Sequence, residues 1–129
     1  LLSKKLGVEK QIHFLGYRDD IKDLLAIADI FLFTTKQEGL PRSMMEAMAS
    51  GLPCIASKVR GNIDLIEDGK GGFLCPHNDV KAFAKAIKSL ICNSELREKM
   101  RDYNLKRIKQ YDINIVVKEM KEIYKNEIL

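Results

Sequence analysis

Short apolar runs alternate with helix-forming segments along the first 75 residues of this 129-residue chain. The run at 30–33, Ile-Phe-Leu-Phe, is continuously apolar, which is typical of a strand buried on both faces of a parallel sheet. Further strands are predicted at 12–15, 53–56 and 71–74. Because strands and helices alternate, the sequence predicts an α/β fold in which helices flank a parallel sheet.

Helix signals lie between the predicted strands. Asp19 or Asp20 is a candidate N-cap for a helix that follows the first strand. The core face of this helix has the spacing i, i+3, i+4, i+7 and consists of Ile21, Leu24, Leu25 and Ala28. Pro41 suits the first turn of a second helix, which runs to about Ser50, and Gly51 suits its C-terminal stop. Both helices therefore connect consecutive strands.

Helix after helix is predicted beyond residue 75. The expected caps are Asn78, Ser94 and Asp112. The last helix is expected to turn four side chains toward the core: Val116, Met120, Ile123 and Tyr124. About four strands precede these helices, which is few for a sheet of this type. We therefore interpret residues 1–129 as a single domain, with one or more strands expected upstream of Leu1.

The composition argues against several classes of protein. With 46% hydrophobic and 31% charged residues, the chain is globular rather than disordered. No apolar run reaches the roughly 18–20 residues that span a bilayer, and residues 1–5 lack the core of a secretion signal, which predicts a cytoplasmic protein. A net charge of +4 without a series of base-stacking aromatics argues against nucleic acid. Cys54, Cys75 and Cys92 are widely spaced, which predicts reduced, mostly buried thiols and no metal site.

Three loops should open at the carboxyl ends of the strands, where ligands bind in open α/β sheets. They span 16–19, 34–41 and 57–62. The middle loop carries Glu38, and Glu46 lies in the helix that Pro41 opens, about 7 Å further along the axis at 1.5 Å per residue. Carboxylates accept paired hydrogen bonds from vicinal hydroxyls of a sugar or ribose. Because the helix N-terminus between them favours phosphate, the pattern indicates an elongated ligand with sugar, phosphate and ribose.

A purely structural interpretation of the two glutamates stays open. A glutamate before a helix stabilises the helix dipole, and one on a helix surface is usually solvated. The residues around Glu46 are mostly apolar: Met44, Met45, Ala47, Met48 and Ala49. We therefore expect this helix to be buried and the carboxylate of Glu46 to need a partner. Lys58 and Arg60 of the third loop could help to neutralise phosphate, although basic residues are common on loops.

A series of motifs resembles a known family. Residues 38–56 read Glu-Gly-Leu-Pro, then four residues, then Glu-Ala-Met-Ala-Ser-Gly-Leu-Pro-Cys-Ile-Ala, and resemble the E-x7-E region of the family 4 retaining glycosyltransferases. Further motifs in the family's order lie at 13–16, 28–33, 59–66 and 71–74. The resemblance implies a GT-B fold, in which two Rossmann-like domains face a cleft, and this chain matches the C-terminal, donor-binding domain. The variant Arg60-Gly-Asn is similar to members that assemble capsule, exopolysaccharide or O-antigen polysaccharides.

The resemblance also implies a role for each residue of the site. Glu38, the catalytic candidate, contacts hydroxyls of the transferred sugar, and Glu46 binds the ribose hydroxyls. The donor sugar and diphosphate lie against Glu38, Gly39, Leu40, Pro41, Arg42 and Ser43, and the base lies near Gly16, Tyr17 and Arg18. The implied reaction is retaining transfer from a nucleotide-diphosphate sugar, UDP-linked by preference, without a cofactor or a tightly bound metal. The implied acceptor is a glycan or a lipid-linked sugar, held by an N-terminal domain outside this chain.

Two departures from the family pattern matter. Many members have a second glycine where this chain has Pro41, and proline has no N–H, so that amide contact must shift to Arg42 or Ser43. The arginine and lysine that members place on the diphosphate belong to a segment upstream of Leu1, so this chain alone is expected to be inactive. Two alternatives stay open: a non-catalytic nucleotide-sugar-binding or interaction module, and a nucleotide-sugar 2-epimerase of the same fold. Peripheral contact of the full-length enzyme with the inner face of the plasma membrane also stays open.

Overall fold

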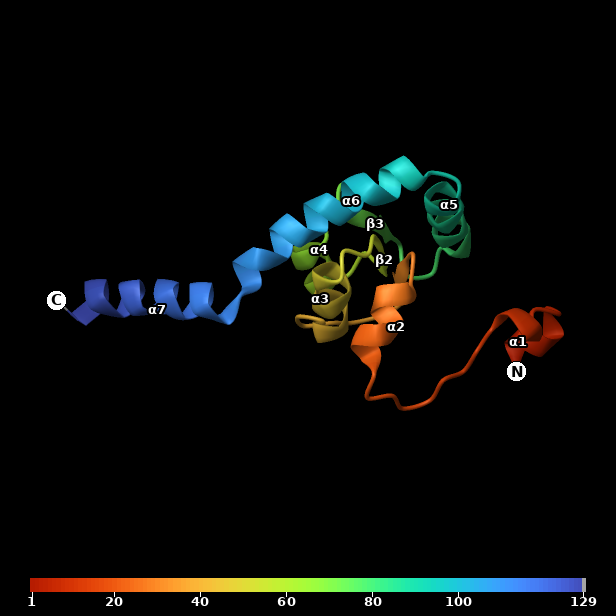
Figure 1. The fold of residues 1–129 in the computed structure, drawn as a ribbon, viewed down its shortest axis with the longest axis horizontal. Coiled ribbons are helices and arrows are strands. Elements are labelled where there is room, and N and C mark those ends of the chain that lie inside the picture. Colours follow the sequence, from red (N-terminus) through yellow and green to blue (C-terminus); the bar gives the residue numbers. More distant parts are fainter. Residues whose placement is uncertain (129) are drawn as a thin grey trace.

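The computed structural model describes residues 1–128, and its centre is a parallel sheet (Figure 1). The strands are β1 (Phe31–Phe33), β2 (Cys54–Ser57) and β3 (Gly72–Cys75), in the order β1-β2-β3. Phe31 lies opposite Cys54, and Cys54 lies opposite Gly72, so the strands start level with one another. The structure confirms the predicted α/β class and the predicted strands at 30–33, 53–56 and 71–74, with their starts shifted by one residue.

Helices connect and flank these strands within the described residues. They are α1 (Leu2–Lys5), α2 (Ile21–Ile27), α3 (Arg42–Ala49), α4 (Arg60–Leu65), α5 (Val80–Ile91), α6 (Ser94–Arg107) and α7 (Ile113–Ile128), with 3-10 turns at η1 (Glu9–Gln11) and η2 (Ile108–Tyr111). In Figure 1, α2 to α6 surround the sheet, whereas α1 and α7 extend from opposite sides of this body. The body that contains the sheet therefore spans α2 to α6.

Two of the predicted helix caps are off by one residue. Asp79, not Asn78, caps α5 by accepting from Ala82 N at 3.0 Å, and Asn93, not Ser94, caps α6 by accepting from Leu96 N at 2.9 Å. In each pair both neighbours can cap a helix, so the sequence alone does not choose between them. Asp112 precedes α7 as predicted, and its carboxylate accepts from Asn114 N at 2.7 Å.

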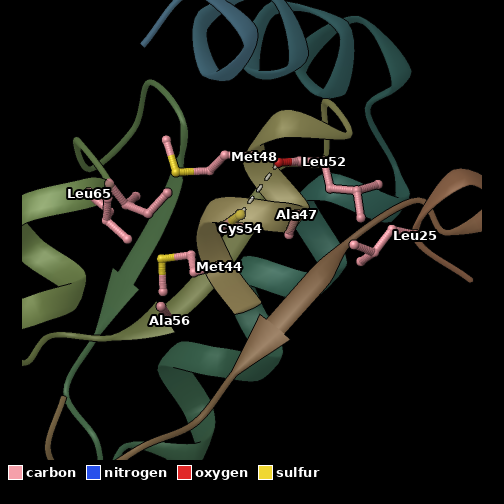
Figure 2. Close-up of a cluster of buried hydrophobic side chains, with 9 residues drawn as sticks. Leu25, Met44, Ala47, Met48, Leu52, Cys54, Ala56 and Leu65 are labelled. Atoms are coloured by element: carbon pink, nitrogen blue, oxygen red, sulfur yellow. Dashed lines mark hydrogen bonds between the residues drawn. The ribbon is translucent and has the colours of Figure 1, made fainter. Parts of the chain in front are cut away.

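The hydrophobic core lies on both faces of the sheet, because alternate residues of β2 point in opposite directions. Cys54 and Ala56 face a cluster that includes Met44 and Met48 of α3, while Ile55 faces a cluster formed by α5 and α6. Figure 2 shows the first cluster, in which Met44 and Met48 extend from α3 toward the side where Leu65 and Ala56 lie. β2 is buried along its whole length. It therefore forms the centre of the fold, against which α3 packs and from which the loop to α4 starts.

The predicted strand at 12–15 is wrong. These residues form no strand in the described chain, and Phe14 is 75% exposed. They belong to an extended link between η1 and α2 that runs outside the sheet (Figure 1). A strand needs a neighbouring strand to pair its N–H and C=O groups, and the link has none among residues 1–128.

Three predicted burial patterns are also wrong. Ile21 and Ala28, assigned to the core face of α2, are exposed, and Leu25 is the buried residue of that set. Leu32 of β1 is 48% exposed, because α5 packs on β2 and β3 and leaves that face of β1 open.

Met120 and Ile123 of α7 are exposed rather than turned to the core, since α7 projects away from the sheet (Figure 1). The side chains of Val116 and Tyr124, predicted to share that inward face, lie outside the described residues.

Candidate functional site

The loop at 34–41 leads from the carboxyl end of β1 to α3. Its first turn is fixed by Thr35, whose hydroxyl donates to Gln37 O at 3.0 Å and accepts from Gln37 N at 3.3 Å. Glu38 follows this turn and is half-buried. The predicted sugar-binding glutamate therefore stands where a parallel α/β sheet commonly binds its ligand.

The start of α3 differs by one residue from the prediction. Pro41 takes the N-cap position, with ψ at 108°, so that the helix begins at Arg42 rather than at the proline. In the described part of the chain no side chain caps α3, and its first turn carries no acidic residue. The N–H groups of Arg42 and Ser43 therefore face the loop with the positive end of the helix dipole, as an anion site requires.

Glu46 is less buried than expected. The buried face of α3 consists of Met44, Ala47 and Met48, and Glu46 lies beside this face with its side chain 44% exposed. The expected partner exists: Arg42 Nε lies 3.4 Å from Glu46 Oε1, one helical turn away. The carboxylate of Glu46 thus has a neighbouring cation in an exposed ion pair and stays open to a ligand.

Two surface hollows meet at Glu46. The larger, of about 800 Å³, lies between α2 and α3 and is lined at one end by Asp19 and Asp20 and at the other by Ser50. The smaller, of about 440 Å³, lies between α3 and η2 and includes Arg42 and Tyr111. A hollow of the larger size matches the volume of small-molecule sites. Glu46 lines it, so its carboxylate oxygens can accept hydrogen bonds from a ligand there.

The predicted base-binding segment, Gly16 to Arg18, leads toward the larger hollow without lining it. Tyr17 is 98% exposed and touches no part of the core. Arg18 forms a paired contact with Asp20, whose carboxylate accepts from Arg18 Nε at 2.7 Å. This hydrogen bonding lowers the pKa of the Asp20 carboxyl, so Asp20 is ionised at neutral pH. The structure therefore brings Arg18 to the edge of the hollow through Asp20, and leaves Tyr17 in solvent.

The third loop, 57–62, contributes residues that the sequence analysis missed. Lys58 and Arg60, considered there for phosphate, are exposed, whereas Asn62 is fully buried and donates from Nδ2 to Ser57 O at 2.8 Å. Gly61 lies against the backbone of Glu38 and Gly39. The available signal was Gly61, because a glycine within a helix often marks a close approach of another backbone.

The structure thus forms two groups of candidate residues around α3. Glu38 and Gly39 lie with the start of α4, and Glu46 and Arg42 lie at the hollows beside α2 and η2. Between them lies the uncapped start of α3. Among residues 1–128 no cluster of three His, Cys, Asp or Glu side chains is arranged to hold a metal ion. Over the same range, no helix is both long and apolar enough to cross a membrane.

These features define the class of the protein: a Rossmann-like α/β domain with polar residues at the loops and helix that follow its parallel strands. Residues 1–107 match the family described as "Glycosyl transferases group 1". The chain therefore belongs to the group 1 glycosyltransferases.

Individual proteins agree with this family. The chain is 30% identical, over 92% of its length, to the Escherichia coli enzyme UDP-Gal:alpha-D-GlcNAc-diphosphoundecaprenol alpha-1,3-galactosyltransferase. It superimposes on Anabaena Alr3699/HepE in complex with UDP with a TM-score of 0.89, at 28% identity over 96% of this chain, and a second structure of that protein contains UDP-glucose. The chain spans 31% of the galactosyltransferase and 35% of the Anabaena protein, about a third of each. The GT-B type of fold that the resemblance implied is confirmed.

Proposed function

We propose that this chain is the donor-binding domain of a retaining glycosyltransferase that transfers a sugar from a nucleotide-diphosphate sugar, preferably UDP-linked, to a glycan or lipid-linked acceptor. The observation that carries the proposal is the placement of Glu46, which is half-exposed, lies next to Arg42 and lines the hollow between α2 and α3. A carboxylate that accepts two hydrogen bonds beside a hollow of this size suits the paired hydroxyls of a ribose. The UDP and UDP-glucose complexes of the Anabaena protein support the choice of nucleotide.

The remaining parts of the donor are assigned along α3. The diphosphate would lie at the uncapped first turn, where the N–H groups of Arg42 and Ser43 and the helix dipole stabilise negative charge. The transferred sugar would lie against the loop from Glu38 to Pro41, with Glu38 accepting from its hydroxyls. Charge develops on the departing diphosphate during transfer, so stabilisation at the start of α3 would act on the transition state. Glu38 and Glu46 are assigned positioning roles by direct contact with the donor, without a cofactor or a tightly bound metal.

We further propose that the full-length enzyme works in the cytoplasm and contacts the inner face of the plasma membrane, where a lipid-linked acceptor would be found. α7 supports this contact, because it projects from the sheet (Figure 1) and exposes Met120 and Ile123 next to Lys121. The galactosyltransferase relative is named for a diphosphoundecaprenol-linked substrate.

Calorimetric titration with UDP and UDP-sugars tests the donor assignment. Glu46→Ala should weaken the binding of UDP about 10- to 100-fold, because a hydrogen bond to a charged group contributes about 1.5–3 kcal/mol. Glu38→Ala should leave the affinity for UDP nearly unchanged and weaken the binding of the sugar-bearing donor by a similar factor. The two variants therefore separate the ribose end of the site from the sugar end.

The matched control is Glu95→Ala. It also removes one partner of an exposed ion pair over one helical turn, with Lys99 Nζ 2.9 Å from Glu95 Oε1, but lies on α6 away from the hollows. It should bind UDP like the wild type. Equal UDP binding by wild type and Glu46→Ala would contradict the ribose assignment. A folded wild type that binds neither UDP nor a UDP-sugar would instead favour a non-catalytic interaction module.

A further inference from the structure

The backbone of α4 lies unusually close to the loop that carries Glu38. A Cβ atom added to Gly61 would overlap with the carbonyl oxygen of Gly39, and would stand 2.7 Å from Gly39 C and 3.0 Å from Glu38 O. These are backbone atoms, which cannot turn aside as a flexible side chain can. Gly61 lies within α4 and has no positive φ, so this glycine is required for space and not for a special backbone conformation.

α4 is the fixed partner in this contact. Asn62 is fully buried and ties the start of the helix to Ser57 O at the end of β2. At the other end, Leu65 and Ile66 belong to the hydrophobic cluster of Figure 2. A side chain at position 61 would therefore displace the loop rather than the helix, because the segment between β1 and α3 has no regular structure and is half-exposed at Glu38.

From this contact we infer that Gly61 is a positioning residue: it lets α4 support the backbone of Glu38 and Gly39, and so sets where the Glu38 carboxylate meets the donor sugar. The inference rests on the proposed function, since it assigns Glu38 to the sugar. Gly61 of α4 contacts the loop through backbone atoms. It thereby joins the residues that determine how the donor sugar is held.

A substitution at Gly61 should leave the position of Glu46 unchanged. Its helix is fixed independently by Met44 and Met48, which are fully buried, and by its own C-terminal turn at Gly51. Moving the Glu38 segment would therefore change the sugar end of the site and leave the ribose end in place. A glycine with a merely structural role would affect the binding of UDP and of a UDP-sugar equally.

The experiment compares the affinities of wild type and Gly61→Ala for UDP, UDP-glucose and UDP-galactose. Two-dimensional NMR titration of the full 129-residue chain measures these affinities together with the integrity of the fold. In Gly61→Ala the better-bound UDP-sugar should lose affinity relative to UDP on the order of tenfold, the expected effect of losing one hydrogen bond to a charged group such as Glu38. Gly69→Ala, at a glycine with a φ of 81° in the turn before β3, should lower stability and leave that ratio unchanged.

Asn62→Ala provides a second variant if Gly61→Ala does not fold. It removes the hydrogen bond to Ser57 O and loosens α4 without adding an atom to the contact, so the UDP-sugar should again lose more affinity than UDP. An unchanged ratio in every folded variant, with both nucleotides bound by the wild type, would overturn the role of Gly61 and leave the proposed function standing. A folded wild type that binds none of the three nucleotides would overturn both.

Discussion

At the scale of single residues, burial determines which side chains can react or bind. Glu46 keeps an open side because its ion pair with Arg42 is exposed, and such a pair contributes less than about 1 kcal/mol. Either partner can therefore exchange it for a ligand contact at little cost. Cys54, in contrast, lies in the core between β2 and α3, where burial raises the pKa of its thiol to about 12. Adjacent elements thus hold an open carboxylate on α3 and an inert thiol on β2.

The three cysteines should differ in reactivity toward a thiol reagent such as DTNB. Cys92 is exposed and should react rapidly at pH 8, whereas Cys54 and Cys75 are buried and should react only after unfolding. Burial raises the pKa of both buried thiols, so little thiolate is available at that pH. Absorbance should show one fast thiol in the native chain and three in denaturant. Cys92→Ser should abolish the fast phase, and a second fast thiol in the native wild type would contradict the burial.

At the scale of elements, the C-terminal end of α3 fixes how the site helix meets β2. Gly51 has a φ of 76°, Gly51 N donates to Met48 O at 3.0 Å and Leu52 N donates to Ala47 O at 3.0 Å. This is the Schellman arrangement, in which a left-handed residue closes the helix. The next residue, Leu52, is buried in the same cluster as Met48. The turn therefore directs the chain from α3 into the buried strand.

Gly51→Ala should lower the free energy of unfolding by about 1–2 kcal/mol, because a side chain disfavours the left-handed region. The added Cβ would also stand 2.9 Å from Cγ of Arg101, a flexible side chain that can move. Urea denaturation measures the loss. Gly51→Asn adds the same Cβ, but asparagine tolerates positive φ better, so its loss should be smaller. Equal losses in both variants would assign the effect to contact with Arg101 instead of backbone strain.

At the scale of the whole molecule, α6 and η2 join segments that are distant in the sequence. Asn104 Nδ2 donates to Leu52 O at 2.8 Å and to Gly71 O at 2.7 Å, which connects the turns before β2 and β3. Arg107 Nε donates to Leu65 O at 2.7 Å, and Tyr111 OH donates to Asp64 O at 2.9 Å. These bonds secure the C-terminal end of α4, so the support that α4 gives to the Glu38 loop depends on a helix more than 40 residues away.

Asn104→Ala should lower the free energy of unfolding by about 2–4 kcal/mol. It would leave the carbonyl groups of Leu52 and Gly71 without their donor in a buried place, and it would open a cavity. Thermal and urea unfolding followed by circular dichroism measure the change. Lys106→Ala, an exposed position on the same helix, should change stability by less than about 0.5 kcal/mol. A loss at Asn104 as small as that at Lys106 would show that the two turns are held by other contacts.

Local patterns predicted the elements that lie inside the fold. The apolar runs at 30–33, 53–56 and 71–74 form the sheet, and Pro41 and Gly51 bound α3, because these signals act over a few residues. The candidate site was found partly in the same way: Glu38 and Glu46 stand on the loop and helix that the sequence predicted. Their roles in binding stay predictions until the donor is titrated.

The tertiary structure decided everything that depends on a partner distant in the sequence. Residues 12–15 have the apolar pattern of a strand, but form none because the sheet of residues 1–128 provides no neighbour. Glu46 is open rather than buried because the orientation of α3 directs Met44 and Met48 to the core. The approach of Gly61 to Glu38 joins α4 to a loop more than 20 residues earlier in the chain. The sequence by itself thus determined the class of fold and the segment that carries the site, since both are encoded locally, whereas packing determined which atoms of that segment are supported, exposed and able to bind.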